Sequence, residues 1–211
     1  MNRNPISGDA QTQRDDAQKA VKGNDLRTVS LKMFGTTLFA TGFSLVVLVF
    51  MSFLIYEGVW GAIVYQLFTL VIYTPILYMA AWRYGDQDRN YVQFGHSETD
   101  LWRGTKIGLL AILPYILLLL VMLFSKIGIL PDLLWLVRLF YSPFIVLFNL
   151  LVPAELAPDV PATIADASYW GILFASLLQL YVPVVTSIAY RIGYKGISLY
   201  HKLIYKENKK A

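Results

Sequence analysis

The chain of 211 residues is 56% hydrophobic and only 15% charged, whereas an average soluble domain carries about 25% charged residues. Together with a mean hydropathy of +0.52, this composition excludes an ordinary soluble domain and indicates an integral membrane protein. The absence of cysteine excludes disulfides, thiolate metal sites and a cysteine nucleophile. A net charge of +4 could suit nucleic acid, but the basic residues flank apolar segments, so we expect anionic lipid headgroups as the partner and no nucleic acid.

The first 33 residues are polar and have too few large apolar side chains to fold, so we expect a cytoplasmic tail. The apolar run that follows is too long for the core of a signal peptide and has no cleavage pattern behind it. Residues 34–55 carry no charge and are long enough to span a hydrocarbon core of about 30 Å. They predict the first transmembrane helix.

The apolar segment 59–82 predicts a second transmembrane helix, joined to the first by the short turn 56–58. Its one strongly polar side chain is Gln66, which we expect to bond to a neighbouring helix. Pro75 removes one backbone hydrogen bond and predicts a kink. Membrane helices tolerate such a kink where neighbours satisfy the freed carbonyl.

The segment 83–106 is polar and mixes basic with acidic residues. Within it, His96, Glu98 and Asp100 alternate, and in a strand they would line one face and could contact a metal. A single histidine beside carboxylates in a solvated loop is the more ordinary interpretation. We therefore predict no metal site and no other cofactor.

Residues 107–124 are uncharged and rich in leucine, and they predict a third transmembrane helix. The segment 125–168 then combines an apolar stretch, 133–152, with an acidic, proline-containing loop. The apolar stretch has the composition of a membrane segment but carries Arg138 and Pro143. Whether it crosses the bilayer decides the sidedness of everything that follows.

Residues 169–190 predict the last transmembrane helix, with Gln179 and a proline inside it. In the tail 191–211, basic residues recur at helical spacing opposite an apolar side, which is typical of an interfacial helix on anionic headgroups. These candidate lipid-facing residues are Arg191, Lys195, Lys202 and Lys206.

The basic residues are concentrated in three places. Six of the 18 Lys and Arg lie in residues 1–33, four in 83–106 and six in 191–211, and the other two are Lys126 and Arg138. Because basic segments favour the cytoplasmic side, we expect both termini and the middle loop to be cytoplasmic. An even number of crossings must then separate each pair.

Three apolar segments follow the middle loop, but this parity permits only two crossings. A charge near mid-bilayer costs roughly 3 kcal/mol on insertion scales, so the stretch with Arg138 is the one that does not cross. We predict an all-α polytopic protein of the cell membrane with four transmembrane helices and a re-entrant or outer-leaflet element at 133–152. The alternative has five crossings and an external basic tail.

The ends of the second and last spans resemble each other. They share five residues in one register: Tyr73, Pro75, Ala81, Arg83 and Gly85 against Tyr181, Pro183, Ala189, Arg191 and Gly193. This match favours a duplicated two-helix unit in parallel orientation, in which the second copy carries the segment 125–168 as an insertion between its helices. Aromatic residues followed by Arg and Gly are also a common way to leave a membrane, which is the competing explanation.

The candidate functional residues are the polar groups of the apolar segments. Arg138 is the sharpest, and on a helix it would share a stripe with Ser142 and Asn149. The simpler explanation is that Arg138 reaches the outer headgroups or pairs with a nearby carboxylate, Asp132 or Glu155. The glutamines Gln66 and Gln179 are expected to hydrogen-bond between helices.

Two classes of function remain open on the sequence. One is a non-enzymatic multi-pass protein that acts through lipids, a membrane protein partner or further copies of itself. The other is a small transporter or channel subunit that uses the 133–152 element and Arg138. An enzyme ranks below both, because the sequence contains no serine, histidine and acid constellation and no metal motif.

Overall fold

The computed structural model describes residues 25–95, 100–153, 155–157 and 160–197. Within them, four helical runs are long and apolar enough to cross a membrane: α2 (Leu26–Met51), α4 (Val59–Gln93), α5 (Arg103–Lys126) and the run Tyr169–Tyr194. The last run consists of α8 (Tyr169–Leu177), the 3-10 turn η3 (Leu178–Leu180) and α9 (Tyr181–Tyr194). The prediction of an essentially all-helical protein with four helices of this length is confirmed.

Shorter elements connect these helices. They are α3 (Phe53–Tyr56), α6 (Leu134–Phe140), the 3-10 turn η1 (Ser142–Phe144), α7 (Ile145–Leu151), strands β1 (Glu155–Ala157) and β2 (Val160–Pro161), and the 3-10 turn η2 (Ile164–Asp166). The two strands pair antiparallel, with Glu155 opposite Pro161. This ribbon is the one β feature of the described residues and belongs to the acidic loop.

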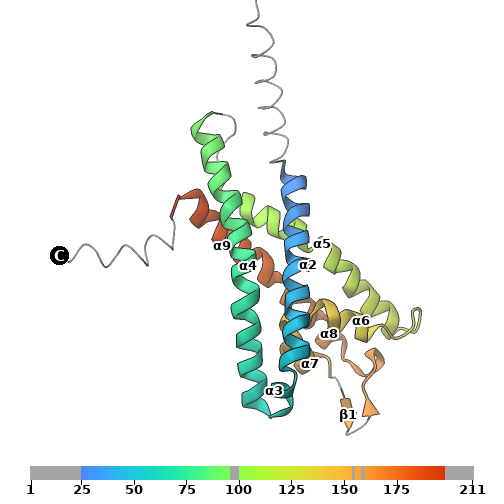
Figure 1. The fold of residues 1–211 in the computed structure, drawn as a ribbon. Helices are drawn as coiled ribbons and strands as arrows, with labels where there is room; N and C mark the ends of the chain where they lie inside the picture. Colours follow the sequence, from blue (N-terminus) through green and yellow to red (C-terminus); the bar gives the residue numbers. More distant parts are fainter. Residues whose placement is uncertain (1–24, 96–99, 154, 158–159, 198–211) are drawn as a thin grey trace, which may run out of the picture.

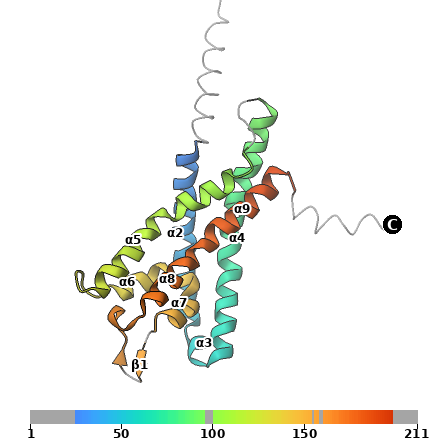
Figure 2. The same cartoon turned by 180° about the vertical axis from the view of Figure 1, so that it is seen from behind.

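The four long helices form a closed ring of neighbours, in which α2 packs on α4 and α5, and α9 packs on the same two helices. Figures 1 and 2 show α4 and α9 running in the same direction and crossing near their C-terminal ends. We call this end, where α2 and α5 also begin, the basic end. The opposite end, which holds α3, α6 and α7, is called the insertion end (Figure 1).

All four long helices extend beyond the apolar segments that predict them, and the last ends at Tyr194 rather than at residue 190. The first begins at Leu26, the second continues to Gln93, and the third begins at Arg103. The added turns are polar, so hydropathy assigns them to loops. One ion pair at i, i+3 spacing, Arg89 to Asp86 at 2.8 Å, supports the extension of α4.

The hydrophobic interior has two parts. One lies between the four long helices and includes Met33, Tyr73, Leu77, Ile107 and Val182. The other lies at the insertion end, where Met122, Val137, Tyr141, Phe148 and Ile172 join α5 and α8 to the insertion. The insertion thus has a core of its own against the second pair of long helices.

Two glycines allow α4 and α9 to meet backbone to backbone at the basic end. A Cβ atom on Gly85 would overlap the carbonyl oxygen of Tyr190, and a Cβ atom on Gly193 would overlap that of Trp82. Small residues at such crossings bring helices within van der Waals contact of each other's backbones. This crossing positions the polar cluster of the basic end described below.

Candidate functional site

The apolar stretch 133–152 is broken in the middle. Helices α6 and α7 have 7 residues each, and the stretch bends by 82° at the break between them. Pro143 lies at this break, where its ring and missing N–H cannot continue a regular helix. Each arm is about 10 Å long at 1.5 Å per residue, so neither arm alone spans a hydrocarbon core of about 30 Å.

The turn η1 at the break of this stretch, which we call the apex, lies between the first two long helices. Ser142 is fully buried and its hydroxyl donates to the carbonyl of Thr41 on α2 at 3.2 Å. From α4, the amide of Gln66 donates to the carbonyl of Pro143 at 2.7 Å. Irregular backbone inside a bundle of apolar helices is tolerated where protein groups satisfy it. The predicted role of Gln66 therefore has a specific partner, the backbone of the break.

Aromatic rings fill the space around this seat. Phe144 packs edge-on against Tyr73 of α4 at 5.7 Å and against Tyr181 of α9 at 5.5 Å between ring centroids. The hydroxyl groups of Tyr181 and Thr74 are 2.6 Å apart and hydrogen-bonded. The break is thus enclosed by α2, α4 and α9 and closely packed.

Arg138 binds the far end of the same element. Its guanidinium donates from Nη2 to the carbonyl of Pro153 at 2.8 Å, while its buried Nε has no hydrogen-bond partner among the residues that the structure describes. No ion pair within 4.0 Å joins Asp132 to Arg138 in the described part of the chain, and the Asp132 carboxylate accepts from the N–H of Leu134 at 2.9 Å. The side chain of Glu155 lies outside the described residues.

The other candidate residues are separated by the two breaks. The 82° bend divides the predicted stripe, so that Asn149 lies on α7 while Arg138 lies on α6. Asn149 is half-buried, and its Oδ1 has no hydrogen-bond partner among the described groups. Gln179 is 3% exposed within η3, and its Oε1 likewise has no partner. Pro183 lies four residues later and cannot donate to the Gln179 carbonyl, which explains this second break.

Lys126 is held in the same way as Arg138. Its ammonium donates to the carbonyls of Ala165, at 2.9 Å, and Ala167, and it lies 4.8 Å from the ring centroid of Tyr169. Both basic residues that fall outside the three basic clusters therefore bind backbone carbonyls of the insertion. The charge pattern marks them as exceptions but does not identify these partners.

A buried polar cluster at the basic end was not anticipated from the sequence. Asp88 on α4 accepts a hydrogen bond from the hydroxyl of Tyr190 at 2.7 Å and pairs with Arg103 of α5 at 3.2 Å. The side chains of Asp88 and Arg103 are 5% and 20% exposed. This cluster, which joins α4, α5 and α9, is called the basic-end cluster. A polar segment with several charges gives no signal for which carboxylate becomes buried.

The residues of the predicted lipid-facing tail are only partly described. The guanidinium of Arg191 lies 5.0 Å from the ring centroid of Trp102, the residue before α5, which is a cation–π contact. Lys195 follows one turn later and is exposed. Lys202 and Lys206 lie outside the described residues, as do His96 and Glu98 of the polar segment.

Comparisons with protein-family models, with curated proteins and with solved structures find no match to this chain. A function must therefore be argued from its own geometry. That geometry combines a broken, buried element with a cluster of basic residues at one end of the bundle.

Proposed function

We propose that the chain is a multi-pass membrane protein with four crossings and both termini in the cytoplasm, which acts through lipid or protein partners rather than as an enzyme. The observation that carries the proposal is the seat of Ser142 and Pro143 between α2 and α4. An element that bends sharply at residues bound inside the bundle is expected to enter and leave the membrane on the same side, whereas a straight crossing has no such bend. The second half of the chain then contributes two crossings.

The distribution of charge supports the same topology. Arg83 and Arg191 lie in the C-terminal parts of α4 and α9, and Arg103 begins α5, so all three belong to the basic end. The basic residues toward the insertion end, Lys126 and Arg138, bind backbone carbonyls. Orientation follows the basic residues of short connections, so we assign the basic end to the cytoplasm.

Reciprocal contacts support a duplicated two-helix unit. In the shared register Trp82 corresponds to Tyr190, and Gly85 to Gly193. Gly85 meets the backbone of Tyr190, and Gly193 meets that of Trp82. Tyr73 and Tyr181, which also correspond, are in ring contact at 6.4 Å. A two-fold axis produces such pairs, because each residue meets the equivalent of its own partner.

The packing of the apex favours a partner-binding protein over a conductor of solutes. Phe144, Tyr73 and Tyr181 occupy the space where an aqueous path beside the broken element would have to run. One observation favours the alternative of a small transporter or channel subunit. The buried Nε of Arg138 and the buried oxygens of Asn149 and Gln179 lack partners in the described structure, and such groups in a membrane often bind a solute.

Reporter fusions test the topology directly. A reporter that is active only in the cytoplasm should be active after Gly95 and after Lys206, and inactive after Gly58 and Gly128. An inactive fusion at Lys206 would establish five crossings and exclude a re-entrant element. The Gly58 fusion, in the first short turn, serves as the matched external control.

A thiol-labelling experiment separates the two functions. In this cysteine-free chain, Arg138→Cys should react with a membrane-impermeant reagent added from outside, because Arg138 bonds to Pro153 at the insertion end. Protection in intact membranes, combined with altered binding of an anionic solute by Arg138→Ala, would support transport instead.

A further inference from the structure

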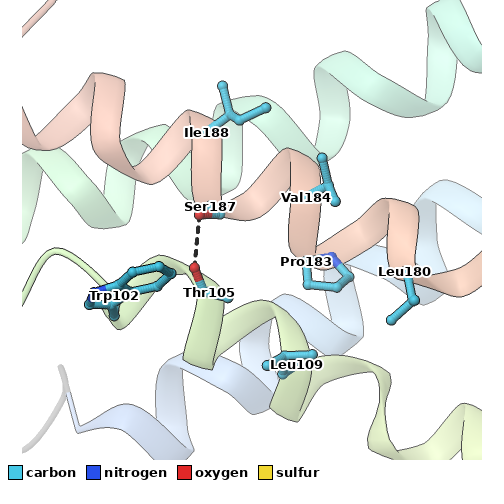
Figure 3. A pocket seen from close by; sticks show the side chains of 8 residues that line it. All are labelled: Trp102, Thr105, Leu109, Leu180, Pro183, Val184, Ser187 and Ile188. Carbon is cyan, nitrogen blue, oxygen red and sulfur yellow. Dashed lines mark hydrogen bonds between the residues drawn. The ribbon is translucent and has the colours of Figure 1, made fainter.

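A groove runs between α5 and α9 on the outside of the bundle. Its volume is about 380 Å³, and it is lined mainly by apolar side chains. Figure 3 shows Trp102 at one end and Leu180 at the other, with Pro183 and Val184 between them. Across its floor the hydroxyls of Thr105 and Ser187 are 2.8 Å apart and satisfy each other. Because these two hydroxyls are already hydrogen-bonded to each other, the groove presents an essentially apolar surface to a ligand.

The groove opens toward a positive charge at the basic end. Arg191 follows Ile188, a lining residue, by three positions, and its guanidinium lies over the ring of Trp102. No carboxylate of the described residues pairs with Arg191. Asp100, the acidic residue beside Trp102 in sequence, accepts instead from Lys106 at 2.7 Å and from the Trp102 N–H at 2.9 Å. The charge at the mouth of the groove thus suits an anion.

The groove and the guanidinium at its mouth together have the length of one leaflet. From Leu180 to Arg191 the helical rise of 1.5 Å per residue gives about 16 Å, and half of a hydrocarbon core of about 30 Å is about 15 Å. Trp and Arg occur together at the level of the headgroups. A chain lying between Trp102 and Leu180 would therefore begin at the headgroups and end near the bilayer centre.

We propose that this groove binds one acyl chain of an anionic glycerophospholipid, with the phosphate at Arg191 and Lys195. The proposal rests on the proposed function, because it requires the basic end to lie at a membrane surface. A transmembrane helix is a poorer fit, since α5 and α9 touch where Gly108 meets Pro183 and a helix with its side chains is about 10 Å wide. The protein would then carry a lipid bound through both its charge and its chain.

The test uses the full chain purified in detergent, with phosphatidylglycerol and phosphatidylcholine of the same acyl chains added in equal amounts. Native mass spectrometry counts the lipids that each chain retains. Wild-type protein should retain one phosphatidylglycerol in preference to phosphatidylcholine. Arg191→Gln should reduce that preference about fivefold, the effect of roughly 1 kcal/mol per basic residue at an anionic surface. Arg83→Gln, at the corresponding turn of α4, should leave it unchanged.

A second pair of variants tests the groove itself. Val184 and Val71 are both exposed valines on long helices, at 55% and 68%, but only Val184 lines the groove. Val184→Trp fills the groove and should abolish the retained lipid, whereas Val71→Trp should not. If Val184→Trp does not accumulate, Leu109→Trp fills the groove from the side of α5.

Two results would overturn the site: equal retention of both lipids by the wild type, or equal loss in Val71→Trp and Val184→Trp. The reporter fusions on the same variants separate this failure from that of the proposed function. If the reporters at Gly95 and Lys206 are active but no lipid is retained, lipid binding by the groove is excluded and the proposed topology stands. An altered reporter pattern excludes the topology on which both proposals stand.

Discussion

The two ends of the molecule are closed in opposite ways. At the basic end, α4 and α9 meet backbone to backbone at Gly85 and Gly193, and a carboxylate pairs with a guanidinium between helices. Toward the insertion end the same helices diverge (Figures 1 and 2), and the insertion occupies the space. There Lys126 and Arg138 donate to backbone carbonyls instead.

The difference shows what each kind of polar contact requires. Helices that cross closely can bury a paired charge, because each element is rigid and presents its partner at a fixed place. An irregular loop exposes carbonyls that its own backbone does not satisfy, and a long basic side chain can reach several of them. The predictions below disturb one end at a time, beginning with the largest expected effect.

Asp88→Ala should cost about 3 kcal/mol, because it removes the buried carboxylate that pairs with Arg103 and accepts from the hydroxyl of Tyr190. The midpoint of thermal unfolding in detergent measures this loss. The matched control is Asp86→Ala in the same turn, whose partner Arg89 is 33% exposed. That exposed pair should contribute less than about 1 kcal/mol. Equal effects of the two variants would show that burial does not matter here.

Gly193→Ala should cost about 2 kcal/mol, the usual effect of overpacking a close contact, because its Cβ meets the backbone of Trp82. Gly35→Ala is the control, since nothing lies within 4 Å of its Cβ. In a helix interior that change should stabilise the protein by up to about 1 kcal/mol. The two substitutions should therefore shift the unfolding midpoint in opposite directions.

Lys126→Met should loosen the insertion end by about 1 kcal/mol while leaving the helix crossing intact, because it removes the donor to Ala165 and Ala167. Amide hydrogen exchange should quicken in residues 162–168 and stay slow at Asp88. Lys106→Met, which removes the exposed pair with Asp100, is the matched control. Faster exchange in α4 would contradict the independence of the two ends.

The smallest predicted effect compares two carboxyl groups, one at each end of the molecule. A hydrogen bond from Lys106 lowers the pKa of Asp100, and backbone and hydroxyl donors of Thr163 lower the pKa of Asp166. Each carboxylate therefore stabilises the folded state above its unfolded pKa of 3.8, and this stabilisation is lost as pH falls through the folded pKa. Salt should raise the pKa of Asp100 toward its usual value and leave that of Asp166 nearly unchanged, measured by carboxyl carbon chemical shifts.

The long helices and the break could be predicted from the sequence, because both depend on local composition. Uncharged apolar runs define the spans, and Arg138 with Pro143 marks the stretch that differs. The seat of the break could not be predicted in this way. Ser142 bonds to a residue 101 positions away, and Asp88 to one 102 positions away. Periodicity describes which face of a helix is buried but does not name the partner.

The seat of the apex has a consequence for the order in which the protein assembles. Thr41 and Gln66 precede Ser142 and Pro143 in the chain, so synthesis completes the first helical pair before the break emerges. The Pro143 carbonyl and the Ser142 hydroxyl then find their partners, the Gln66 amide and the Thr41 carbonyl, already in place. A nascent chain that lacks α2 and α4 has no such receptor, and its break would leave unsatisfied backbone in the lipid.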